Sequence, residues 1–129
     1  MKICEQDLIR AFHTKFGFTL NDTPSPIDER QAEDRSIILE EETNELRKAL
    51  FSKDIIKIAD AIADVVYVAK GTAVACGLDS LTMDFVFREV HRSNMTKEKP
   101  SGCVGKAIKG AEYSPPDLTS IIETKKRTT

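Results

Sequence analysis

Acidic side chains are concentrated at two places in the sequence, and their spacing suits the binding of a metal ion. Residues 40–45 read Glu-Glu-Glu-Thr-Asn-Glu, and two aspartates, Asp60 and Asp64, follow in an otherwise apolar stretch. Positions three and four apart share one face of a helix, so Glu42 neighbours Glu45 and Asp60 neighbours Asp64. Two helices would therefore each present an acidic patch.

These two patches are expected to face each other across a helical hairpin. If the chain breaks near residues 52 and 53 and returns antiparallel, Glu45 lies opposite Asp60 and Glu41 lies opposite Asp64. Like charges destabilise an exposed helix by about 0.2 to 0.5 kcal/mol per pair, and by more when they are partly desolvated. Mg²⁺ and Mn²⁺ prefer oxygen ligands and would offset this repulsion.

A solvated acidic face is the alternative interpretation of residues 40–45, because runs of charge on a helix commonly face water. The second patch argues against it. Asp60 and Asp64 stand among Ile, Ala and Val residues, and acids in an apolar helix need a partner. A divalent cation, Mg²⁺ or in its place Mn²⁺, is therefore the expected cofactor.

Helices are expected to carry these residues, because alternation of period two is absent and Gly and Pro cluster at a few breaks. Asp28 suits an N-cap, and Gly77 suits the position just after a helix end. The most apolar segment, ending at Gly77, is expected to be the central core helix. The expected helices are residues 5–16, 29–51, 54–76, 80–94 and, more briefly, 117–122.

Apolar residues at helical spacing predict the buried face of each helix. These faces are Leu8, Ile9, Phe12 and Phe16 in the first helix, Ile38, Leu39, Leu46 and Leu50 in the second, and Leu81, Phe85, Val86 and Val90 in the fourth. One chain has too few helices to cover every side of its apolar third helix. The predicted fold is therefore an all-α bundle of four to five helices, completed by oligomerisation.

The bulk composition favours one domain over residues 1–129, with an irregular basic segment from about residue 97. The chain is 40% apolar and 31% charged, which suits a single core. No apolar run reaches membrane-span length and the first residues do not resemble a signal peptide, so a cytoplasmic protein is expected. Cys4, Cys76 and Cys103 lack disulfide or zinc spacing and are expected to be free thiols.

The net charge of −2 hides an asymmetry along the chain. Residues 28–64 carry eleven acids against six bases, whereas residues 86–129 carry nine bases against five acids. An acidic middle and a basic end suit a metal site beside a phosphate site, although solvated faces give similar counts. The basic residues 125–127 are expected to form a disordered tail, and no nucleic acid or membrane partner is expected.

The motifs together resemble the all-α nucleoside triphosphate pyrophosphatases, the superfamily of MazG-like and phosphoribosyl-ATP pyrophosphohydrolase-like proteins. Residues 39–46 (LEEETNEL) and 58–67 (IADAIADVVY) resemble its EExxE and ExxD signature. The similarity continues through residues 67–73, 90–97 and 105–118. One departure is Ala61, which stands where the signature has an acid, while Asp60 stands one position earlier on the Asp64 face.

The resemblance implies Mg²⁺-dependent hydrolysis between the α and β phosphates of a nucleotide, giving a monophosphate and pyrophosphate. It implies that Glu42, Glu45 and Asp64 bind the metal, with Asp60 substituting for the missing acid, and that Glu41 binds or activates the attacking water. It also implies a homodimer or homotetramer. Phosphoryl transfer needs charge neutralisation and an aligned nucleophile, and such a site supplies both.

Five further residues are candidates for substrate binding. The family motif implies that Asn94 and Lys97, at the end of the fourth helix, contact the nucleotide, whereas simple helix termination is the alternative explanation of both. Lys70, Lys106 and Lys109 are candidate phosphate ligands, but Lys70 is as well explained by a charge that extends to the surface, and the other two by a solvated tail. His13 and His91 are expected to be structural.

Three functions therefore stay open. The first is hydrolysis of a ribo- or deoxynucleoside triphosphate in nucleotide house-cleaning. The second is phosphoribosyl-ATP hydrolysis in histidine biosynthesis, which needs the same acids and a different pocket. The third is a catalytically silent helical module whose acids dock a basic partner. The sequence does not name the base, because base specificity depends on the shape of a pocket built from several helices.

Overall fold

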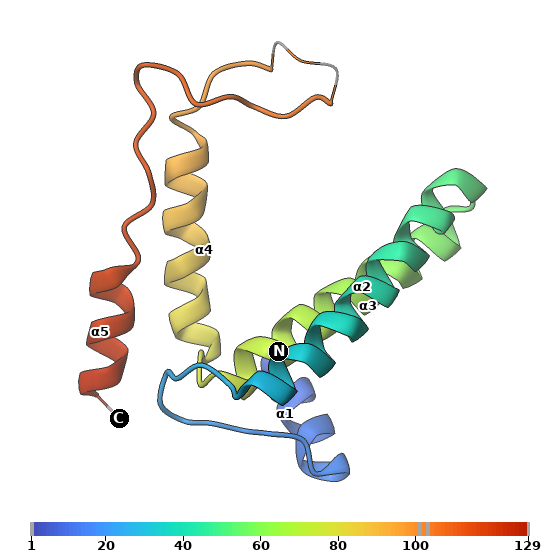
Figure 1. Cartoon of the computed structure of the whole chain (residues 1–129), viewed down its shortest axis with the longest axis vertical. Helices are drawn as coiled ribbons and strands as arrows, with labels where there is room; N and C mark the ends of the chain where they lie inside the picture. The colour runs from blue at the N-terminus through green and yellow to red at the C-terminus, as the bar shows by residue number, and fades with distance from the viewer. Residues whose placement is uncertain (1, 101, 103, 129) are drawn as a thin grey trace. The chain divides into compact units, whose positions relative to one another are not determined.

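The chain is all-helical in the computed structural model, which describes residues 2–100, 102 and 104–128. Within these residues there is no strand, only an isolated bridge between Glu98 and Ile108. The helices are α1 (Glu5–Phe16), α2 (Glu29–Ser52), α3 (Ile55–Ala75), α4 (Ser80–Asn94) and α5 (Thr119–Arg127) (Figure 1). The predicted all-α class is confirmed, while oligomerisation stays a prediction.

Two compact units make up the chain, Met1–Asp79 and Ser80–Thr129. The first holds α1 to α3 and the second holds α4 and α5. No single helix of the described part is long and apolar enough to span a membrane. Cys4 and Cys76 are free thiols, as expected, whereas Cys103 lies outside the described residues.

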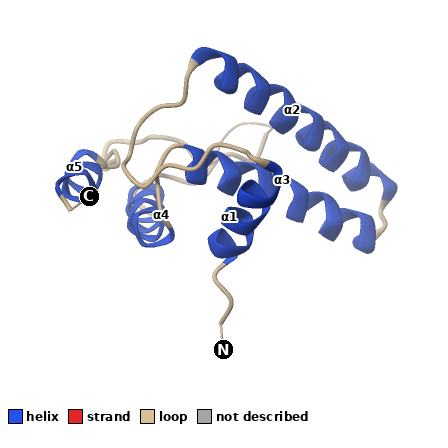
Figure 2. Ribbon diagram, turned by 90° about the horizontal axis from the view of Figure 1, so that it is seen from below, coloured by secondary structure: helices blue, strands red, loops and turns tan. Residues whose placement is uncertain are grey.

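A helical hairpin of α2 and α3 dominates the first unit, and the two helices lie side by side in both views (Figures 1 and 2). Asp28 caps α2 as predicted, its carboxylate accepting the Gln31 amide at 2.8 Å. The hairpin turns at Lys53, which adopts a left-handed conformation with φ of 60°. Asp54 then caps α3 by accepting from the Ile56 and Lys57 amides. The predicted break is thus confirmed.

The end of α3 is held by the loop that joins α1 to α2. The Asn21 side chain donates to the Ala75 carbonyl at 2.7 Å, and the Ser25 amide donates to the Cys76 carbonyl at 2.9 Å. Gly77 follows with φ of 72°, as expected for the residue after a helix end, and a Cβ there would collide with the Thr23 carbonyl. This loop therefore fixes where α3 stops.

The buried core of the first unit is small and rich in alanine. Its apolar members are Ile9, Ala49, Ala61, Ala73, Val74 and Ala75. The expected apolar faces are largely exposed in the single chain, including Leu8, Phe16, Ile38 and Leu50. On α1, the buried residues are instead Gln6, Ile9 and His13. The expectation that these apolar faces are buried was wrong within this unit, because α3 presents small residues to its neighbours and the three helices of the unit leave the rest uncovered.

The second unit pairs α4 with the C-terminal segment and α5. Glu89 accepts from the Arg92 guanidinium and from the Asp117 amide at 3.1 Å, while Arg92 also donates to the Pro115 carbonyl at 3.1 Å. The fourth helix begins and ends as predicted. Its expected face is again only partly covered, with Leu81 and Phe85 exposed.

The C-terminal helix is longer than expected. The sequence predicted a short helix at 117–122 and a disordered tail, but α5 runs from Thr119 to Arg127. Its last turn contains Lys125, Lys126 and Arg127, whose positive charges favour the negative end of a helix dipole. The basic cluster thus stabilises helix continuation where a disordered tail was predicted.

Candidate functional site

The register of the α2 and α3 hairpin brings the two acidic patches together. Arg35 on α2 donates to the Thr72 hydroxyl at 2.6 Å and to the Val68 carbonyl at 2.9 Å, both on α3. These partners bracket Lys70, which lies opposite Arg35 if Glu45 lies opposite Asp60 in an antiparallel hairpin. The structure therefore agrees with the predicted register, which places residues 41–45 of α2 beside residues 60–64 of α3.

We define the acidic cluster as Glu41, Glu42, Glu45, Asp60 and Asp64, of which Glu42 is the most buried. Partial burial is the first cause that raises the pKa of Glu42 above its ordinary value, and the charges of Asp64, Glu41, Glu45 and Asp60 add to it. The negative charge of every other member of the cluster thus raises the pKa of this one carboxylate. Five acidic side chains from two helices thus share one electrostatic environment.

The acidic cluster fits a divalent cation in donor type. Carboxylate oxygens are the ligands that Mg²⁺ and Mn²⁺ prefer. Over the described residues, no three His, Cys, Asp or Glu side chains are placed closely enough to hold an ion as they stand. Apart from half-buried Glu42, the members of the cluster are exposed, and exposed side chains change rotamer readily. The carboxylates would therefore have to change rotamer to bind one ion together.

Two ion pairs involve predicted site residues of the first unit. Glu45 accepts from Lys48 at 3.2 Å, and both side chains are exposed, so this pair contributes little to stability. Lys70 on α3 pairs with Glu5 of α1 at 2.9 Å. Lys70 therefore joins α1 to α3 in this conformation, and its predicted contact with phosphate stays a prediction.

The other substrate-binding candidates belong to the second unit. Asn94 ends α4, and its carbonyl accepts the Lys97 amide at 3.1 Å. Lys106 is exposed in the segment that follows. The Lys109 ammonium lies 5.1 Å from the centre of the Tyr113 ring, a cation-π contact. The roles of Asn94, Lys97, Lys106 and Lys109 stay predictions.

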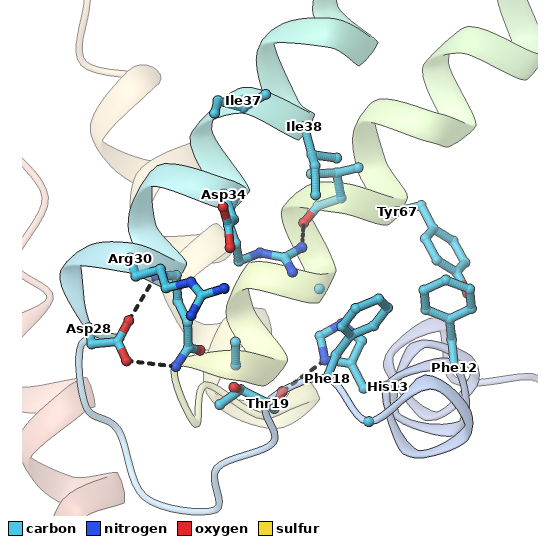
Figure 3. A pocket seen from close by; sticks show the side chains of 16 residues that line it. Phe12, His13, Phe18, Thr19, Asp28, Arg30, Asp34, Ile37, Ile38 and Tyr67 are labelled. Atoms are coloured by element: carbon cyan, nitrogen blue, oxygen red, sulfur yellow. Dashed lines mark hydrogen bonds between the residues drawn. The ribbon is translucent and has the colours of Figure 1, made fainter.

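A cavity of about 770 Å³ opens inside the first unit, next to the acidic cluster along both hairpin helices. It is bounded by the end of α1, the loop after it, the first half of α2 and the second half of α3. Phe12, Phe18 and Tyr67 lie together at one side of it, and Arg30 and Asp34 of α2 lie at the other (Figure 3). A cavity of this volume is within the range of small-ligand sites.

Polar side chains of the cavity were missed by sequence reasoning. His13 is buried, and because a carbonyl only accepts, its Nδ1 must donate to the Thr19 carbonyl at 2.8 Å. Arg35 lines the same cavity. A Cβ on Gly71 would lie 2.5 Å from Arg35 Nη2 and 3.1 Å from His13 Nε2. A glycine inside the apolar third helix was the signal of this close approach.

A helical hairpin whose two arms carry facing carboxylates, within an all-helical chain, defines the class as an all-α nucleotide pyrophosphohydrolase. Residues 9–94 match the family model described as phosphoribosyl-ATP pyrophosphohydrolase, and the chain belongs to that family. The matched range contains the hairpin, the acidic cluster and the cavity. The family consists of hydrolases that act on phosphoric anhydrides. A comparison with curated proteins finds no match.

Proposed function

We propose that the protein hydrolyses a ribo- or deoxynucleoside triphosphate between its α and β phosphates, releasing a nucleoside monophosphate and pyrophosphate. One observation carries the proposal: the hairpin register gathers the acidic cluster around Glu42 within the family-matched residues. Such a cluster is costly without a cation and suited to a phosphate-bound cation. The reaction serves nucleotide house-cleaning.

Each acid has a proposed role. Glu42, Glu45, Asp60 and Asp64 hold Mg²⁺ or Mn²⁺, and Asp60 does so in place of the acid that Ala61 lacks. Bound metal supplies charge neutralisation at the phosphate oxygens. Glu41 orients the attacking water and accepts its proton as the anhydride bond breaks, so that no covalent nucleophile is needed.

Phosphoribosyl-ATP is the second candidate substrate. The description of the matched family favours it, and its hydrolysis makes the same demand on the acids. The two substrates differ in the group carried by the base, so the cavity rather than the acidic cluster must discriminate between them.

Pyrophosphate release from a panel of ribo- and deoxynucleoside triphosphates and from phosphoribosyl-ATP, each with and without Mg²⁺, tests the proposal. We expect metal-dependent release from at least one nucleoside triphosphate. Release from phosphoribosyl-ATP alone would select the second candidate. No release from any nucleotide, with an unchanged melting temperature on adding Mg²⁺, would contradict both and favour a silent helical module.

We further propose that a second copy of the chain covers the apolar surface of the hairpin. At its tip, Phe51, Ile55 and Ile56 are 76%, 74% and 79% exposed, and grouped exposed apolar side chains are typical of interaction surfaces. Light scattering at micromolar concentration should give a dimer or tetramer. Phe51→Glu should shift the protein toward monomer, and a monomeric wild type would contradict this proposal.

A further inference from the structure

We propose that Arg92 and Thr96 are positioning residues that build a phosphate site at the end of α4. They hold the returning C-terminal segment against this helix, and the attachment places Lys97 opposite Lys109. The inference rests on the proposed function, since it gives the phosphate chain of the substrate a second set of partners besides the metal. The ligand class is a di- or triphosphate anion.

Residues 114–117, the sequence Ser-Pro-Pro-Asp, form a strap that runs back beside α4 to α5 (Figure 1). Its two prolines have no amide hydrogen, so only Ser114 and Asp117 have amide donors. The Ser114 amide donates to the Thr96 hydroxyl at 2.8 Å. The Asp117 amide donates to the Glu89 carboxylate at 3.1 Å. Every amide donor of the strap is therefore used to attach it.

Arg92 attaches the strap between these two points. Its Nη1 donates to the Ser114 hydroxyl and its Nη2 to the Pro115 carbonyl, both at 3.1 Å. Glu89 accepts from the same guanidinium at 2.8 Å and so orients it. Glu89, Arg92 and Thr96 are three and four positions apart, so they lie along one side of α4 and the turn that follows it. Three side chains thus hold the strap along its length.

The Thr96 hydroxyl also joins the strap to the end of the helix. It donates to the carbonyl of buried Ser93 at 2.7 Å while it accepts from the strap amide. A hydroxyl can do both, because it has one hydrogen and two lone pairs. Lys97 follows directly, and its amide donates to the Asn94 carbonyl at 3.1 Å. The two bonds of Thr96 therefore fix the backbone immediately before Lys97.

An antiparallel bridge brings a second lysine to the same point. Glu98 and Ile108 exchange backbone hydrogen bonds of 2.8 and 3.1 Å. The residues next to this pair, Lys97 and Lys109, are therefore opposite each other. The Lys109 ammonium lies 5.1 Å from the centre of the Tyr113 ring, which directly precedes the strap. Both lysines thus lie where the strap begins.

An anion is needed to offset the charges of the two lysines. Like charges at opposite positions of an antiparallel pair are destabilising. No described Asp or Glu forms an ion pair with Lys97 or Lys109. The carboxylate of Glu98 lies against Gly110, where a Cβ would collide with it. Phosphate oxygens form strong, charge-assisted hydrogen bonds with ammonium groups, so a phosphate chain suits this pair.

Calorimetric titration of the metal-free protein with inorganic pyrophosphate tests the site. We expect Lys97→Ala and Lys109→Ala each to weaken binding about tenfold, as expected for loss of one charge-assisted contact. Lys99→Ala is the matched control, because it removes a lysine of the same segment whose opposite residue is Ala107. This control should change binding less than about twofold. Equal losses in all three variants, or no binding by the wild type, would overturn the inference.

Thr96→Val tests the positioning role, because it removes the hydroxyl and keeps the size of the side chain. It should weaken pyrophosphate binding about fivefold, whereas Thr96→Ser, which keeps the hydroxyl, should retain it. Thr124→Val is the control, since the Thr124 hydroxyl donates to the Ser120 carbonyl within α5. With all variants folded by circular dichroism, unchanged binding by Thr96→Val would overturn the positioning role.

Arg92→Ala should weaken pyrophosphate binding in the same direction as Thr96→Val. Arg88→Ala is its control, because it removes an exposed arginine one turn earlier on α4. Equal affinities of these two variants would overturn the role of Arg92.

Hydrolysis measured alongside separates this inference from the proposed function. A lost phosphate contact weakens the ground state and the transition state alike, so Thr96→Val should raise KM about fivefold and change kcat less than about twofold. If the wild type hydrolyses a nucleotide but Thr96→Val and Lys109→Ala keep its KM, the phosphate site fails alone. If no nucleotide is hydrolysed while pyrophosphate binding still depends on Thr96, the proposed reaction fails alone.

Discussion

The Arg35 guanidinium on α2 donates to the Thr72 hydroxyl on α3 at 2.6 Å, and this bond links the two arms of the hairpin. A second bond joins the same guanidinium to the Val68 carbonyl, one turn earlier on α3, at 2.9 Å. The acidic cluster lies further along the same two helices, so its assembly depends on the register that Arg35 helps to fix. Arg35 thus connects the fold to the candidate site.

Replacing Arg35 should destabilise the protein measurably. Arg35→Ala removes two charge-assisted hydrogen bonds, and we expect a loss of about 1 to 3 kcal/mol in the free energy of unfolding. Urea denaturation at a fixed protein concentration measures it. Arg47→Ala is the control, because Arg47 contacts only the exposed Phe51 ring among the interactions described for it. Equal losses in the two variants would contradict the register role of Arg35.

Glu42 should destabilise the metal-free protein at neutral pH. Burial and the neighbouring acids raise the pKa of Glu42 in the folded state. The ionised carboxylate therefore lowers the free energy of unfolding; this loss is absent below the unfolded pKa and complete above the folded pKa. Glu42→Gln should therefore raise the Tm at pH 7 and leave it nearly unchanged at pH 3. Scanning calorimetry without metal checks this, with Glu40→Gln as control. A lower Tm for Glu42→Gln at pH 7 would refute the repulsion.

The stabilising effect of Mg²⁺ should depend on the same carboxylate. A cation that binds only the folded state raises the Tm according to its concentration and affinity. We expect Mg²⁺ to raise the Tm of the wild type and of Glu40→Gln, and to raise that of Glu42→Gln much less. Equal shifts in all three proteins would show that Glu42 does not bind the ion.

Asp28 should make the start of α2 sensitive to acid. Hydrogen bonds from the Gln31 amide and side chain lower the pKa of Asp28 below its ordinary value of 3.8. The stability it contributes is therefore present above the unfolded pKa and is lost as the pH falls through the folded pKa. The Tm difference between wild type and Asp28→Ala should shrink below about pH 4, whereas Asp28→Asn should keep its advantage over Asp28→Ala. A pH-independent difference for the wild type would contradict this.

Glu89 should hold the C-terminal segment against α4. Hydrogen bonds from Arg92 and from the Asp117 amide lower the pKa of Glu89, so its contribution persists at neutral pH and is lost as the pH falls through the folded pKa. Glu89→Gln should accelerate amide exchange at Ser114, Asp117 and Leu118 at neutral pH. Glu123→Gln, on α5, is the control. Unchanged exchange in Glu89→Gln would exclude this role.

Much of the backbone was predictable because its signals are local. Asp28 and Gly77 mark helix ends through capping chemistry, and the break at Lys53 sets the hairpin register that places Glu42 near Asp64. These features depend on a few consecutive residues or on helical spacing, both of which can be read from one sequence.

The burial of individual side chains was harder to predict, because it depends on which other helices pack against each helix. Periodicity correctly found apolar stripes, but Phe16 and Leu50 are exposed in the single chain while His13 is buried. The cavity was missed for the same reason, since it combines residues from α1, α2 and α3. Among the residues that line the cavity, Gly71 gave a local signal, because a glycine is unfavourable inside a helix and therefore needs a structural reason.

The most direct test of the central claim compares Glu41→Gln with Glu40→Gln in Mg²⁺-dependent pyrophosphate release. The two residues are adjacent on α2, and only Glu41 belongs to the acidic cluster. We predict that Glu41→Gln lowers kcat by about 10²- to 10⁴-fold, as expected for loss of a general base, and that Glu40→Gln keeps wild-type activity. Equal activity of the two variants, whether retained or lost, would contradict the account.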